Sequence, residues 1–232
     1  MDERMKNIYS TVGTASLATL LFKRGLRNQF VQGVSRLGPG RTRLVGPAFT
    51  LRCIPAREDL NSIEVYENPD HPQRKAVETV PSAHVLVMDC RGDARAASAG
   101  AILVTRLQMR GCAGLVTDGG LRDVDEIAGL DMPSYCARPS APTSLTRHHA
   151  IDLNVPIGCG GVAVFPGDIA VGDGDGVIII PAELTAELAE EVSAMEQFED
   201  FVLEEVRNGA SIIGLYPPDA ATRARYNAAK PR

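Results

Sequence analysis

The stretch Gly100–Ile127 constrains the fold more than any other part of the chain. Residues 101–110 carry apolar side chains at close to helical spacing, and Gly111 supplies the left-handed residue with which many helices end. The run Leu115–Thr117 is short, apolar and partly β-branched, which predicts a buried strand. The Asp-Gly-Gly turn at 118–120 then ends that strand sharply. This order predicts a helix, a strand and a polar turn.

A second apolar strand is predicted just before this stretch, at residues 84–90 (HVLVMDC). Strand, helix and strand in succession form a βαβ unit with parallel pairing and a right-handed crossover. Ligands of such units gather at the carboxyl ends of the strands. We therefore expect an α/β fold with its site near residues 118–123 and the start of the helix at Gly100.

The remaining elements are predicted from the same kinds of pattern. They are a helix over 14–24, a strand over 47–53, a short helix over 74–80, an irregular segment over 135–145, short antiparallel or barrel-like strands over 155–181, a long helix from Pro181 to about Asn208, and a polar, mobile tail after Pro218. We see no internal repeat and no linker. Residues 1–232 are therefore expected to form a single domain with helical segments at both ends.

Composition narrows the function classes. The net charge of -5 argues against a broad phosphate-binding surface, and the absence of tryptophan leaves few platforms for base stacking, so nucleic acid is not expected as a partner. The five cysteines are scattered and never form CxxC, so neither a disulfide framework nor a zinc site is indicated. With no apolar run of membrane-spanning length, a cytoplasmic protein is expected.

Asp123 allows two interpretations. It stands at a helix start with Glu126 three residues later, which is a capping-box pattern, and a cap stabilises a helix by about 1 kcal/mol. Alternatively, its carboxylate is a metal ligand next to the cation of Arg122. Asp118 is explained equally well as an ordinary turn residue.

The functional interpretation combines three features. Magnesium-type ions take one or two carboxylates and keep waters and substrate oxygens in their other positions. The planar guanidinium of Arg122 suits a carboxylate or enolate oxygen. Free N–H groups at a helix start bind anions, here those of Gly100, Ala101, Ile102 and Leu103. Together they would surround a small 2-keto acid and stabilise its enolate, which carbon–carbon cleavage next to a ketone requires.

Four motifs resemble a known family. They are GAIL at 100–103, GCAGLVTDGGLRD at 111–123, PIGCGGVAVFPGD at 156–168 and DGVIIIP at 175–181. They are similar to the ribonuclease regulator A-like (RraA-like) proteins, and in particular to the branch of divalent-metal 4-hydroxy-4-methyl-2-oxoglutarate aldolases that also decarboxylate oxaloacetate.

The resemblance implies a swivelling β/β/α fold with a layered central sheet and flanking helices, assembled as a homotrimer or hexamer with sites between subunits. It also implies that Asp123 binds Mg²⁺ or Mn²⁺, that Arg122 binds substrate and steadies the enolate, and that amides around Ile102 and Leu103 hold the pyruvyl carboxylate.

One position departs from the family pattern. Ala101 stands where the aldolases often carry an acidic or amide residue, which bears on proton handling and on the branched diacid substrate. In the family a glutamate of a neighbouring subunit's C-terminal helix assists the metal waters, and Glu196 and Glu199 are candidates. Arg57 belongs to a solvated loop or holds an anionic substrate. His148 and His149, adjacent on a predicted strand, point to opposite faces and have a structural role or contact the substrate.

The leading expectation is thus a metal-dependent, pyruvate-forming lyase that cleaves a 2-keto acid by retro-aldol chemistry, with oxaloacetate decarboxylation as a side activity. One alternative is a binding protein that regulates a ribonuclease, although the regulator proper lacks the aspartate found here at Asp123. Another is a dehydratase or other lyase acting on a 2-keto-3-deoxy sugar acid.

Overall fold

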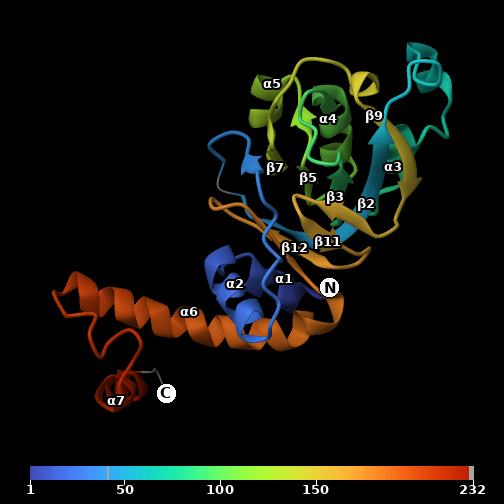
Figure 1. Ribbon diagram of the computed structural model, residues 1–232. Coiled ribbons are helices and arrows are strands. Elements are labelled where there is room, and N and C mark those ends of the chain that lie inside the picture. The colour runs from blue at the N-terminus through green and yellow to red at the C-terminus, as the bar shows by residue number, and fades with distance from the viewer. Residues whose placement is uncertain (41, 230–232) are drawn as a thin grey trace.

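The protein is built around one curled, mixed sheet. The computed structural model describes residues 1–40 and 42–229. The main sheet has the order β1 (Ser35–Arg36), β7 (Ser134–Cys136), β5 (Gly114–Thr117), β3 (Val85–Asp89), β2 (Leu44–Pro55), β12 (Ile169–Gly172) and β13 (Val177–Ile180), and β9 (His148–Leu153) also pairs with β2 (Figure 1). Strands β2, β3, β5 and β7 are mutually parallel, and the other pairings are antiparallel.

Two small sheets extend this frame. One is parallel and consists of β4 (Ala97–Ala99), β6 (Gly120–Leu121) and β8 (Arg138–Pro139). The other is the hairpin of β10 (Ile157–Cys159) and β11 (Val162–Val164). Neither small sheet continues the strand order of the main sheet.

The two faces of the main sheet are buried in two different cores. On β3, Leu86 and Met88 face a core shared with α3 (Pro72–Thr79), α4 (Ala101–Met109) and α5 (Val124–Ala128). Val85 and Val87 face the opposite side, where β10 and β11 cover them. This period of two places apolar side chains on both faces of a parallel sheet, as such sheets require.

A third core lies under the remaining helices. Helices α1 (Glu3–Tyr9), α2 (Thr14–Lys23) and α6 (Thr185–Arg207) pack on apolar residues of β12 and β13. Three 3₁₀ turns complete the chain: η1 (Ile63–Glu67), η2 (Ser144–Thr146) and η3 (Ala182–Leu184). None of the helices in residues 1–40 and 42–229 has both the length and the apolar character needed to cross a bilayer.

The α/β class and the layered sheet with flanking helices are confirmed, as is the parallel βαβ unit of β3, α4 and β5. Two expectations need correction. The segment 135–145, expected to be irregular, contributes to β7, β8 and η2 because sheet pairing orders it. The tail contains a helix that was not predicted, α7 (Ala220–Ala229), whose Tyr226 ring lies 5.1 Å from that of Phe198 on α6; its mobility stays a prediction. In Figure 1, α6 extends well beyond the body of the domain, with α7 near its far end.

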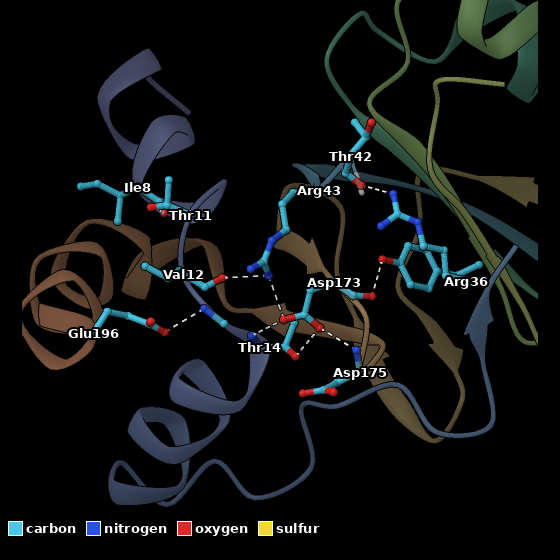
Figure 2. A network of polar contacts seen from close by, with 12 residues as sticks. Ile8, Thr11, Val12, Thr14, Arg36, Thr42, Arg43, Asp173, Asp175 and Glu196 are labelled. Atoms are coloured by element: carbon cyan, nitrogen blue, oxygen red, sulfur yellow. Dashed lines mark hydrogen bonds and ion pairs between the residues drawn. The ribbon is translucent and has the colours of Figure 1, made fainter. Parts of the chain in front are cut away.

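A buried carboxylate joins the helical layer to the sheet. Asp173 follows β12, and its Oδ2 accepts hydrogen bonds from the Thr14 amide and Arg43 Nη1, each at 2.8 Å (Figure 2). Its Oδ1 accepts from the Thr14 hydroxyl at 2.8 Å and the Asp175 amide at 2.9 Å. Burial acts to raise the pKa of Asp173, but these donors and the Arg43 charge outweigh it and lower the pKa.

We expect Asp173→Asn to lower the free energy of unfolding by about 2–4 kcal/mol, because an amide leaves buried donors unsatisfied and Arg43 uncompensated. In thermal melts the Tm should fall by roughly 5–10 °C. Asp175→Asn is the control, since the Asp175 side chain is exposed, and it should change little.

The stability that Asp173 contributes should depend on pH. Because the folded-state pKa is depressed, the stabilisation is present above the unfolded-state pKa of about 3.9 and is lost as the pH falls through the folded value. The difference between wild type and Asp173→Asn should therefore shrink below about pH 4. A difference that stays constant from pH 7 to pH 3 would contradict this assignment.

Candidate active site

The turn that leads to the candidate site begins with the Asp118 carboxylate, directly after β5. Its Oδ1 accepts a hydrogen bond from the Cys90 amide at 2.6 Å, and its Oδ2 accepts from the amides of Gly92 at 2.9 Å and Gly160 at 3.3 Å. Burial raises the pKa of Asp118, and the three backbone donors oppose that effect. Asp118 thus joins its own turn to two other loops, a larger role than that of an ordinary turn residue.

The two glycines after Asp118 allow the chain to pass through this crowded region. A Cβ on Gly119 would lie 2.8 Å from the Sγ and the Cβ of Cys90. A Cβ on Gly120 would lie 2.6 Å from the Cβ of Ser140 and 2.9 Å from the Ala96 carbonyl oxygen. The Asp-Gly-Gly sequence therefore supplies a carboxylate that binds loop amides and two residues without side chains, which lets β6 follow at once.

Arg122 and Asp123 come directly after β6. Asp123 adopts a left-handed backbone conformation, with φ 57°, and its side chain makes no capping bond to α5. Instead its Oδ2 accepts a hydrogen bond from the Ala101 amide at 3.1 Å and lies 3.8 Å from Arg122 Nε. Both side chains are 46% exposed. The capping-box interpretation is therefore wrong, and the carboxylate points toward the start of α4.

The start of α4 approaches this pair closely because Gly100 has no side chain. A Cβ there would lie 2.6 Å from Asp123 Oδ2 and 2.9 Å from Arg122 Nε. The amides of Leu103 and Val104 donate to the Gly100 carbonyl. Within the described part of the chain, the amides of Gly100 and Ile102 have no hydrogen-bond partner. Such donors at a helix start, with the helix dipole behind them, are suited to an anion.

A cavity of about 100 Å³ lies where these groups meet. Its lining includes the sequence-predicted residues Gly100, Ile102, Leu103, Arg122 and Asp123. Ala101, also predicted to contact substrate, is absent from the lining, and its amide is already used by Asp123.

Several lining residues are not predicted by the sequence patterns. They are Tyr66 of η1, Gln73 and Arg74 of α3, and Thr143 and Ser144 at the start of η2. The connection from β2 to β3 brings the first three to the cavity, and the Ala97 amide holds the Thr143 loop by donating to the Pro142 carbonyl at 2.9 Å. Nothing in their local sequence signals this placement, which depends on strand pairing far along the chain.

Other candidates lie away from this cavity. Arg57 forms an exposed ion pair with Asp59, with 2.7 Å between Nε and Oδ1, which agrees with the solvated-loop interpretation. His148 is buried, with Nε2 3.3 Å from the Ala96 carbonyl oxygen, and burial lowers its pKa. The Nδ1 of His149 accepts from the Asn61 amide at 2.7 Å. Both histidines therefore have structural contacts within this chain.

The two glutamates of α6 also have partners within their own chain. Glu196 Oε1 accepts from the Gly13 amide at 2.8 Å. Glu199 accepts from the Ser16 hydroxyl and the Tyr216 hydroxyl, each at 3.1 Å. In the described residues no group of three or more His, Cys, Asp or Glu side chains is placed to hold a metal. Among the described residues that line the cavity, Asp123 is the one with a carboxylate.

Comparisons with known proteins identify relatives of two kinds. A protein of Halalkalibacterium halodurans named "Putative 4-hydroxy-4-methyl-2-oxoglutarate aldolase" is 34% identical over 139 residues, which cover 60% of this chain and 60% of that protein. The matched region thus spans less than two thirds of that relative.

Two solved structures share the fold. RraAS2 of Streptomyces coelicolor, described as an unusual member of the RNase ES inhibitor RraA protein family, has a TM-score of 0.76 and 28% identity, covering 87% of this chain and 96% of that one. An uncharacterised protein of Pseudomonas syringae has a TM-score of 0.79 and 25% identity, covering 93% and 98%.

The family model for "RraA-like: Aldolase/RraA" matches residues 14–179, a region that holds both the Asp118–Asp123 turn and every residue lining the cavity. This match covers more than half of the chain. The chain therefore belongs to the RraA-like family.

Proposed function

We propose that the protein is a divalent-metal-dependent, pyruvate-forming lyase that acts on a 2-keto acid. The observation that carries this proposal is the Asp123 carboxylate, which does not cap its helix and instead faces the cavity beside Arg122 and the start of α4. The name of the Halalkalibacterium relative supports a lyase of this kind.

The substrate's 2-keto acid end would occupy the anion site. The unpartnered amides of Gly100 and Ile102 would donate to its carboxylate, aided by the dipole of α4. The guanidinium of Arg122, which has only a 3.8 Å contact with Asp123, would donate to the keto oxygen. As bond cleavage turns that oxygen into an enolate, a well-placed donor stabilises the transition state by about 3 kcal/mol.

The residues present fit a magnesium-type ion. Such ions take one or two protein carboxylates and leave their other positions to water and substrate oxygens. Asp123 supplies one carboxylate, and its Oδ1 has no hydrogen-bond partner in the described residues. Asp123 would therefore hold Mg²⁺ or Mn²⁺, which when bound supplies Lewis-acid polarisation of the keto group.

Proton handling distinguishes two reactions of this kind. Retro-aldol cleavage needs a base for the distal hydroxyl, yet the lining contains no histidine or glutamate, and Ala101 provides none. Decarboxylation of oxaloacetate breaks the bond to the carboxylate, releases CO₂ and leaves the enolate, so it needs no base. The enolate then takes a proton to give pyruvate. Oxaloacetate is therefore the first substrate to assay.

We expect the purified protein with Mg²⁺ or Mn²⁺ to release pyruvate from oxaloacetate faster than the metal alone. Asp123→Asn should lower kcat/KM about 100-fold or more, and Arg122→Lys about 10- to 100-fold because the planar fork is lost. Asp125→Asn, which changes a neighbouring acid outside the cavity, is the control. Pyruvate release unchanged in Asp123→Asn would contradict the proposal.

Metal binding can be measured without turnover. Titration of Mn²⁺, followed by the paramagnetic resonance of the free ion, should show binding to wild type and to Arg122→Lys but weak binding to Asp123→Asn. The reason is that Asp123 alone supplies a carboxylate from this lining. If wild type and Asp123→Asn bind Mn²⁺ equally well, Asp123 is not the ligand.

We also propose a homotrimer or hexamer with sites between subunits. The support from this chain is apolar exposure on α4: Ile102, which lines the cavity, is 83% exposed, and Met109, at the other end of the helix, is 73% exposed. Light scattering during gel filtration should give three or six times the chain mass of 24.8 kDa. A monomeric mass would argue against shared sites.

A second candidate function is ribonuclease regulation, favoured by the likeness to Streptomyces RraAS2. It predicts that the purified protein slows RNA cleavage by a ribonuclease from the same cell, and that Asp123→Asn does so equally well. Such inhibition in a protein that binds no metal and releases no pyruvate would replace the lyase proposal. A dehydratase or other lyase acting on a 2-keto-3-deoxy sugar acid would be recognised by its products.

A further inference from the structure

Few groups in the cavity lining can give up or take a proton. General acids and bases in enzymes are most often His, Glu, Asp, Lys, Tyr or Cys side chains. Among the described residues that line the cavity, only Tyr66 and Asp123 belong to these types. Asp123 is the carboxylate assigned to the metal, so it is ionised and has no proton to give. Tyr66, on η1, is therefore the one proton donor of this kind in the described lining.

The proposed reaction needs a proton donor at one defined step. Loss of CO₂ from oxaloacetate leaves the enolate of pyruvate, which becomes pyruvate only when its C3 carbon takes a proton. Tyr66 lines the same cavity of about 100 Å³ as Arg122 and the start of α4, where the enolate would lie. Because the cavity is small, an enolate held by Arg122 lies close to Tyr66 as well.

The hydroxyl of Tyr66 has no partner in the protein, unlike those of three other tyrosines. Tyr9 and Tyr135 donate to main-chain carbonyls at 2.6 and 2.7 Å, and Tyr216 donates to a glutamate at 3.1 Å. Within residues 1–40 and 42–229, the Tyr66 hydroxyl makes no such hydrogen bond. Its proton is therefore available to a ligand in the cavity.

A cation faces the Tyr66 ring. The guanidinium carbon of Arg74 lies 4.3 Å from the centre of that ring. In the described residues Arg74 has no carboxylate partner, whereas neighbouring Lys75 pairs with Asp70 at 2.9 Å. When the Tyr66 hydroxyl loses its proton, the negative charge spreads from the oxygen into the ring and lies opposite this cation. The attraction between the two charges favours the proton transfer.

The Tyr66 ring is held in place by its neighbours. His71 packs edge-on against it, with 5.1 Å between ring centroids, and Arg74 lies over one face. Next to Arg74 in the chain, Gln73 is 4% exposed, and its Nε2 donates to the Ser98 carbonyl at 2.5 Å. Tyr66 thus contacts a segment that is itself fixed near the start of α4.

We propose that Tyr66 is a catalytic acid that gives its hydroxyl proton to C3 of the pyruvate enolate. The electron pair of the enolate double bond forms the new C–H bond, the enolate oxygen becomes the keto oxygen, and the O–H pair stays on the tyrosine oxygen. The tyrosinate then regains a proton from water. In the reverse direction, the same oxygen removes a proton from the methyl group of pyruvate. This inference rests on the proposed lyase function for its enolate.

Exchange of the pyruvate methyl hydrogens with solvent tests this step by itself. In D₂O with Mg²⁺, wild type should replace these hydrogens by deuterium faster than the metal alone, as followed by proton NMR. Tyr66→Phe keeps the ring that contacts Arg74 and His71 but removes the hydroxyl. It should slow the exchange by about 100-fold or more, the usual contribution of a general acid–base group. Its consumption of oxaloacetate should change less than about fivefold, because the bond to CO₂ breaks without a proton donor.

Tyr216→Phe is the control variant. It removes a tyrosine hydroxyl that lies outside the cavity, where it donates to Glu199. Both of its rates should equal those of wild type. Thermal melts should give Tyr66→Phe the Tm of wild type, since the hydroxyl that it loses has no partner in the described residues. A slow exchange in Tyr66→Phe then reports on the hydroxyl alone.

The two assays separate this inference from the lyase proposal. If wild type exchanges pyruvate hydrogens but does not consume oxaloacetate, and Tyr66→Phe loses the exchange, the lyase proposal fails and the role of Tyr66 stands. If oxaloacetate is consumed but Tyr66→Phe exchanges at the wild-type rate, the role of Tyr66 is wrong. An equal fall in both rates would indicate a structural role and overturn the inference, as would exchange by wild type no faster than by the metal alone.

Discussion

The site depends on one buried carboxylate. Asp118 receives hydrogen bonds from backbone amides of the loop after β3 and of the β10–β11 turn, so these two segments are fixed at the end of β5. Since each donor and the carboxylate would be costly to bury alone, the arrangement is stable only as a unit. The turn that leaves Asp118 then has a defined direction, and Arg122 and Asp123 follow four and five residues later.

The sequence could predict those parts of the site that lie close together in the chain, but not the distant ones. Gly100, Arg122 and Asp123 belong to one βαβ unit and its turn, so helical periodicity and the Asp-Gly-Gly signal bring them together. The sequence could not show whether Asp123 caps its helix or leaves its carboxylate free. The capping-box pattern allows both, and the backbone φ of Asp123 decides between them. Tyr66, Gln73 and Arg74 reach the cavity only through the pairing of β2 with β3, which local pattern does not specify.

The two halves of the cavity differ in how they are supported. Gly100, Arg122 and Asp123 are set by close approach: a Cβ at Gly100 would collide with both charged side chains. Arg74 is set by stacking on Tyr66 and by the hydrogen bond of its neighbour Gln73 to the Ser98 carbonyl. The close approach at Gly100 tolerates almost no increase in side-chain volume. Arg74 is instead held through its neighbours, so a different residue at position 74 would be tolerated.

The placement of the connection from β2 to β3 has a consequence for how the cavity can change in evolution. It leaves the sheet after Pro55, supplies one wall of the cavity and returns at Val85, without contributing a strand to the main sheet. Changes in its length or sequence can alter which molecule the cavity accepts while β3, β5 and the Asp118 turn stay as they are. One scaffold can in this way carry cavity walls of different shape and charge beside an unchanged Asp118 turn.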